Sequence, residues 1–145
     1  MGTASDYRAR ADHIARAALG SPSRRVRLSR PTRPHATCLA VPEVRARLRQ
    51  LGACRRELRQ VKGELWTTMH RIRAAYLRRR IGAAGAWCRP WATWVRMWLR
   101  HAEGATLVPY RATARRIDAH LARIDAASAP LARRLASDEE GRAGR

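Results

Sequence analysis

An apolar repeat between Pro42 and Arg80 is the feature that most constrains the fold of this chain. Its members are Val44, Leu48, Leu51, Leu58, Val61, Leu65, Met69, Ile72 and Tyr76. They are separated by three or four residues, with one gap of seven, the spacing that places side chains on one face of an α-helix. Pro42 suits the first turn of such a helix. At about 1.5 Å per residue the helix is roughly 60 Å long, too long for one compact core to cover, so we expect it to pair along its length as a hairpin or coiled coil.

A shorter amphipathic helix is expected over Ser5–Leu19, followed by an extended basic arm. Its apolar positions are Tyr7, Ala11, Ile14 and Ala18, with Ser5 as a candidate N-cap and Gly20 as the stop. The stretch from Ser21 to Pro42 contains four prolines, which exclude a long helix, and they alternate with Arg24, Arg25, Arg27, Arg30 and Arg33.

The C-terminal half is expected to contain two further helices. We expect Gly82 and Gly85 to break the long helix, and a second helix to follow from Pro90 and stop near Gly104. A third is expected from near Pro109, with a kink or restart at Pro130. Its seam is Tyr110, Ala114, Ile117, Leu121, Ile124, Ser128, Leu131 and Leu135.

The expected fold class is all-α, because no stretch alternates convincingly between apolar and polar residues with a period of two. The architecture is a long amphipathic helix packed in a helical hairpin or three-helix bundle, with a basic N-terminal arm. We divide the chain into a short helix plus the Pro/Arg-rich arm (1–41), a helical domain (42–136) and a tail (137–145). The tail is expected to be flexible, because it combines acidic residues and glycines without apolar anchors.

The net charge of +20 predicts an anionic partner, since each cation that meets a phosphate releases a condensed counterion. The segment Pro42–Arg80 carries eleven Arg and Lys62 against three Glu, or +9. On a helical wheel, Arg45, Arg49, Arg56, Arg59, Arg71 and Arg78 share one side and the glutamates another, which favours phosphate contact over a merely solvated exterior. The candidate nucleic-acid-binding residues are these six with Arg79 and Arg80 at the helix end and Arg24, Arg25, Arg27, Arg30 and Arg33 in the arm.

Four tryptophans, Trp87, Trp91, Trp94 and Trp98, fall within one narrow arc of the second helix, with Arg89, Arg96 and Arg100 nearly opposite. We expect Trp91, Trp94 and Trp98 to pack against the long helix, as the bulky part of a core that has no Phe. Two alternatives stay open: insertion of the stripe into a membrane surface and stacking on unpaired bases.

No sequence motif indicates an enzyme active site, a metal site or a cofactor site. The histidines are scattered, and Cys38, Cys54 and Cys88 have neither disulfide-framework nor zinc-site spacing. With no secretory or membrane-spanning pattern, we expect an intracellular, cytoplasmic protein. The expected function is largely sequence-tolerant binding of DNA or RNA through phosphates, with a homodimer possible through the long helix. A membrane-surface protein, a helical scaffold or assembly subunit, and a reading frame never selected for a fold are the alternatives.

Overall fold

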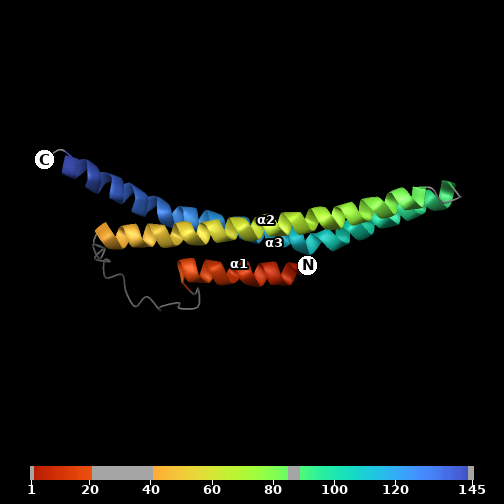
Figure 1. The fold of residues 1–145 in the computed structure, drawn as a ribbon, viewed down its shortest axis with the longest axis horizontal. Helices are drawn as coiled ribbons and strands as arrows, with labels where there is room; N and C mark the ends of the chain where they lie inside the picture. Colours follow the sequence, from red (N-terminus) through yellow and green to blue (C-terminus); the bar gives the residue numbers. More distant parts are fainter. Residues whose placement is uncertain (1, 21–40, 85–88, 144–145) are drawn as a thin grey trace, which may run out of the picture. The chain divides into compact units, whose positions relative to one another are not determined.

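The computed structural model describes residues 2–20, 41–84 and 89–143, and these residues form three packed α-helices (Figure 1). Helix α1 is Ala4–Leu19, α2 is Val41–Ala84 and α3 is Arg89–Ala143. The three described stretches contain no strand, so the predicted all-α class, with a helical hairpin or three-helix packing, is confirmed. The predicted basic arm lies almost entirely at residues 21–40, outside the described residues.

Both ends of α1 are closed by local hydrogen bonds. Thr3 Oγ1 accepts from the Asp6 N–H at 3.3 Å, and Asp6 Oδ2 accepts from the Thr3 N–H at 2.7 Å, the reciprocal pattern of a capping box. At the other end Gly20, with a φ of 81°, donates its N–H to the Arg16 carbonyl at 2.9 Å. The predicted stop at Gly20 is therefore confirmed. The predicted N-cap at Ser5 is wrong, because Thr3 caps the helix and Ser5 lies within its first turn.

The helices contribute to two compact units, each of which contains a part of all three. Unit 1 comprises Met1–Arg10 and Gln60–Asp118, and unit 2 comprises Ala11–Arg59 and Ala119–Arg145. The division of the chain into residues 1–41, 42–136 and 137–145 stays a prediction. Helix α3 nevertheless continues to Ala143, through most of the segment that was expected to be a flexible tail.

The predicted seam of α2 forms the core. Val44, Leu51, Leu58 and Leu65 recur every seven residues and are all buried, as heptad positions of paired helices are. Val61 and Met69 are buried beside them, and the remaining seam members, Leu48, Ile72 and Tyr76, are half-buried. The expected break at Gly82 is wrong, since α2 continues through it to Ala84. Gly85 lies outside the described residues.

Three polar contacts fix the antiparallel register of α2 against α3 in unit 1. Lys62 Nζ lies 2.5 Å from Asp118 Oδ1, Tyr76 Oη lies 3.0 Å from Thr106 Oγ1, and Arg80 is paired with Glu103. Residue numbers thus fall on α3 as they rise on α2. In unit 2 the same antiparallel order is set by Arg55 with Asp125 at 3.1 Å and by Arg45 with Glu139 at 2.9 Å.

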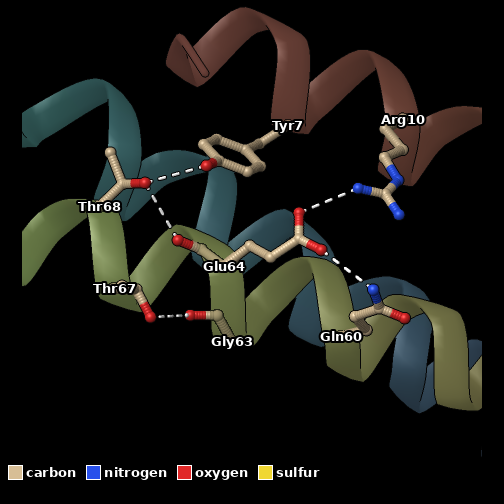
Figure 2. Close-up of polar contacts among 7 residues, drawn as sticks. All are labelled: Tyr7, Arg10, Gln60, Gly63, Glu64, Thr67 and Thr68. Atoms are coloured by element: carbon tan, nitrogen blue, oxygen red, sulfur yellow. Dashed lines mark hydrogen bonds and ion pairs between the residues drawn. The ribbon is translucent and has the colours of Figure 1, made fainter. Parts of the chain in front are cut away.

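Helix α1 is attached to α2 in unit 1 through Tyr7 and Arg10, as Figure 2 shows. The Thr68 hydroxyl donates to the Glu64 carbonyl at 3.1 Å, so its oxygen accepts the proton of Tyr7 Oη at 2.9 Å. Arg10 Nη1 lies 2.9 Å from Glu64 Oε2, and Gln60 donates to the other carboxylate oxygen at 3.1 Å. One glutamate therefore joins α1 to α2 while bonding along its own helix.

In unit 2, α1 packs through a small apolar face and two polar contacts. Ala11, Ile14, Ala15 and Ala18 are buried. Asp12 Oδ1 lies 2.8 Å from His120 Nε2 on α3, and Arg47 of α2 donates to the Ala18 carbonyl at 2.6 Å. The last contact satisfies a carbonyl that the end of a helix leaves without an intrahelical donor.

Helix α3 is continuous where the sequence predicted two helices. The stop near Gly104 and the restart near Pro109 are wrong, since both residues lie inside α3. Of the two alternatives at Pro130, the restart is wrong for the same reason, and the kink stays a prediction. A proline in a helix interior removes one backbone hydrogen bond, but burial on both sides of Pro109, by Leu107 and Ile117, holds the helix together.

Candidate functional site

The arginines of α2 that lie in unit 2 form an exposed surface, which we call the α2 basic face: Arg45, Arg49, Arg56 and Arg59. At 100° per residue these four fall within an arc of about 80°, on the side of the helix away from the buried Leu58. The apolar seam dictates this placement, because it turns the opposite side of α2 outward. Arg45 is in addition bound to Glu139, so most of the positive charge that this face offers to a ligand comes from Arg49, Arg56 and Arg59.

The arginines predicted toward the C-terminal end of α2 lie in unit 1 and are not equivalent. Arg71 and Arg78 are exposed and seven residues apart, on one row of the helix. The guanidinium of Arg79 lies 5.9 Å from the centre of the Tyr76 ring, within cation–π range. Arg80 is half-buried and paired with Glu103, so its charge serves the contact between α2 and α3.

Carboxylates are drawn into contacts between helices, which leaves the outer faces rich in arginine. At least five of the eleven acidic side chains form interhelical ion pairs with Arg or Lys, namely Glu64, Glu103, Asp118, Asp125 and Glu139, and Asp12 contacts His120 of α3. Glu139 contacts Arg45, a member of the α2 basic face. Of the three glutamates of α2, Glu64 takes part in such a pair, with Arg10 of α1, whereas Glu43 and Glu57 are exposed.

The arm residues Arg24, Arg25, Arg27, Arg30 and Arg33 lie outside the described residues, and their role stays a prediction. Among the described residues no group of three or more His, Cys, Asp or Glu side chains could hold a metal ion. In the same stretches no helix has an apolar segment of the length needed to cross a membrane.

The tryptophans of α3 do not form a core, contrary to the expectation from the sequence. Trp91, Trp94 and Trp98 are 58, 61 and 56% exposed, and Trp87 lies outside the described residues. The buried positions in this part of α3 belong to Ala92 and Leu99, which are turned by about 100° from Trp91 and Trp98 respectively.

A seven-residue repeat in the sequence does mark the buried side of α3, but it is hard to recognise because several of its members are polar. Ala92, Leu99, Thr106, Thr113 and His120 recur every seven residues, and all except Thr106 are buried. Thr113 is held by its hydroxyl, which donates to the Pro109 carbonyl at 2.9 Å, and His120 is held by its contact with Asp12. A prediction based on large apolar side chains does not recognise this row and assigns the tryptophans to the buried side instead.

An open pocket of about 550 Å³ lies between α1 and α3 in unit 1. It is lined by Ala4, Ser5 and Arg8 of α1 and by Pro109, Ala112, Thr113 and Arg116 of α3. The Thr113 hydroxyl also approaches the Ala4 carbonyl, at 3.3 Å. The pocket therefore places the first turns of α1 beside this part of α3.

Comparison of the chain with family models, with curated proteins and with solved structures finds no match.

Proposed function

We propose that this protein binds nucleic acid inside the cell, through contacts between phosphates and the α2 basic face. The observation that carries the proposal is the exposure of Arg45, Arg49, Arg56 and Arg59 within one narrow sector of a single helix. Guanidinium groups bind phosphate oxygens in bidentate geometry and remain charged at any physiological pH.

The length of the face suits an extended polyanion. From Arg45 to Arg59 the helix rises by roughly 21 Å, which corresponds to about six nucleotides of one strand at 3.4 Å each. The net charge of +20 adds long-range attraction to any nucleic acid. Because phosphates are common to all sequences, the binding is expected to be sequence-tolerant and strongly dependent on salt.

The homodimer expected from the sequence stays a prediction. The seam of α2 that would have formed it is buried within the chain, since Leu51, Leu58 and Leu65 are at most 1% exposed. A nucleic-acid complex needs no second copy, because the α2 basic face is exposed on a single chain.

The test replaces Arg49, Arg56 and Arg59 together by glutamine and measures affinity for labelled duplex DNA and for single-stranded RNA over a salt series. Arg45 is left in place so that its contact with Glu139 is preserved. Loss of three phosphate contacts should reduce the slope of log K against log salt by about 2.7 for duplex DNA.

The matched control replaces Arg111, Arg115 and Arg123 by glutamine, which removes the same charge from exposed positions of α3. We expect this control to lower affinity slightly through the net charge while keeping the salt slope close to that of the unchanged protein. Equal slopes in the two triple variants would remove the α2 basic face from the proposal. Circular dichroism on the same samples verifies that both remain helical.

A further inference from the structure

Helix α3 carries an exposed apolar surface that the nucleic-acid proposal does not use. We call it the α3 apolar face and define it as Trp91, Trp94, Met97, Trp98 and Val108, all of which lie in unit 1. Their exposed fractions run from 56 to 66%. On a wheel of 100° per residue they occupy a continuous arc of about 120°, which also holds His101 and Ala105.

The rest of this part of α3 divides into two other sectors. The buried Ala92 and Leu99 face the core of unit 1. Exposed arginines, Arg96, Arg100 and Arg111, lie within about 60° of one another and far from the centre of the apolar arc, in a sector that also holds the buried Leu107. An apolar arc wider than about 100° is normally the buried side of a helix. Here α3 already has a buried side, and the apolar arc is a separate, exposed side, which indicates that a second partner binds it.

Further along the chain, the same row of α3 lies beside α1. Pro109, Ala112 and Arg116 follow Trp91, Trp94 and Trp98 by eighteen residues each, which is five full turns. All six are exposed, but only the later three line the open pocket between α1 and α3. A helix placed in continuation of α1 would cover the tryptophans but would leave Met97 and Val108 exposed, because these lie up to about 120° further round α3.

We propose that α3 lies in the headgroup region of an anionic membrane, with the α3 apolar face turned toward the acyl chains. A flat surface covers the whole arc at once, including the two residues that a docked helix would miss. The segment 91–108 is roughly 26 Å long, sufficient for an interfacial helix lying in the membrane plane. Tryptophan is the side chain most suited to this depth, because its ring is apolar and its N–H remains close to polar groups.

Charge complementarity makes the surface an anionic one. Arg100 borders Met97 on the wheel within about 60°, and Arg115 follows Met97 by five turns on the same row; both are exposed. Long arginine side chains at the edge of an apolar face reach back to headgroup phosphates. The net charge of +20 adds attraction to a negative leaflet, which acts over about one Debye length.

The experiment uses the full chain with vesicles of mixed phosphatidylcholine and phosphatidylglycerol, and with phosphatidylcholine alone. We expect co-sedimentation with the anionic vesicles, a blue shift of tryptophan emission, and quenching by brominated acyl chains. The variant W91A/W94A/W98A should lose at least about tenfold in vesicle affinity, because the face then has no ring to bury. Its control is W66A, since Trp66 is also exposed but lies on α2, outside the α3 apolar face.

A second variant separates a membrane from the other occupants. The change M97A/V108A should also weaken vesicle binding, by several fold, because both side chains enter the interface. Stacking of unpaired bases, or a helix in line with α1, would require the tryptophans but not Met97 and Val108. Vesicle affinity unchanged in either variant would overturn the proposal. So would tryptophan emission that responds to single-stranded oligonucleotides and not to vesicles.

Discussion

Trp98 and Arg116 occupy the same row of α3, five helical turns apart, and both are exposed, but only Arg116 lines the open pocket that α3 forms with the first turns of α1. The difference follows from where α1 begins. Its described residues start at Gly2, and its helix at Ala4, which lies beside Pro109 and Thr113. The tryptophan part of α3 precedes that point and receives no cover from α1.

The exposure of the tryptophans can be tested through stability. Replacing Trp91, Trp94 and Trp98 together by alanine should change the free energy of unfolding by no more than about 1.5 kcal/mol, since surface substitutions typically contribute within about 0.5 kcal/mol each. Leu58→Ala, at a fully buried position, should cost about 2–5 kcal/mol. Urea denaturation compares the two. A triple variant as unstable as Leu58→Ala would indicate that the tryptophans are packed in the core.

The bond between Tyr7 and Thr68 should contribute measurably to the attachment of α1. Tyr7→Phe removes a part-buried hydrogen bond of 2.9 Å, and we expect a loss of about 0.5–1.5 kcal/mol in urea denaturation. The matched change is Tyr76→Phe, which removes an exposed bond of 3.0 Å to Thr106 and should cost less because water replaces the partner. Equal costs would contradict the described packing of α1.

The capping box makes the start of α1 sensitive to acid. The hydrogen bond from the Thr3 N–H, and then that with the Thr3 hydroxyl, lower the pKa of Asp6 below its usual value of 3.8. A carboxylate with a lowered pKa stabilises the folded helix end above pH 3.8, and that contribution is lost as the pH falls through the folded pKa. An NMR titration of the Asp6 carboxyl should show the lowered pKa, and Thr3→Ala should raise it. A pKa unchanged by that substitution would contradict the contribution of the Thr3 hydroxyl, and an Asp6 pKa that is not lowered in the unchanged protein would contradict the cap.

The continuity of α3 predicts an unusual effect of removing proline. Pro109 lies in the helix interior, where proline is about 3 kcal/mol less favourable than alanine, so Pro109→Ala should stabilise the protein by up to that amount. Pro42→Ala is the control, since the first turn of α2 accepts proline without loss. A thermal unfolding midpoint that stays unchanged in Pro109→Ala would indicate two helices separated at this residue.

The regular heptads of α2 explain why its seam could be predicted from the sequence. Val44, Leu51, Leu58 and Leu65 are large and apolar, so periodicity alone identifies the buried side and, opposite it, the arginine side. The candidate basic face followed from the same wheel. What the wheel could not give was the pairing of Arg80 with Glu103, which depends on the register of a second helix.

The prediction of two helices in the C-terminal half was wrong because α3 is continuous through residues with low helix propensity. Gly104 and Pro109 are residues that commonly end helices, but the packing of Leu107 and Ile117 outweighs them. Thr113 and His120 occupy buried positions that are usually apolar. The Thr113 hydroxyl bonds to the Pro109 carbonyl and His120 Nε2 bonds to Asp12, and such partners become visible only in three dimensions.

The most direct test of the central claim is the salt dependence of duplex DNA binding by the unchanged protein. Three phosphate contacts, from Arg49, Arg56 and Arg59 of the α2 basic face, predict a slope of log K against log salt of at least about 2.7 in magnitude. A slope of that size, reduced when Arg49, Arg56 and Arg59 are replaced, would support phosphate binding through this face. A helical protein with no measurable affinity at low salt, or with a slope near zero, would contradict it.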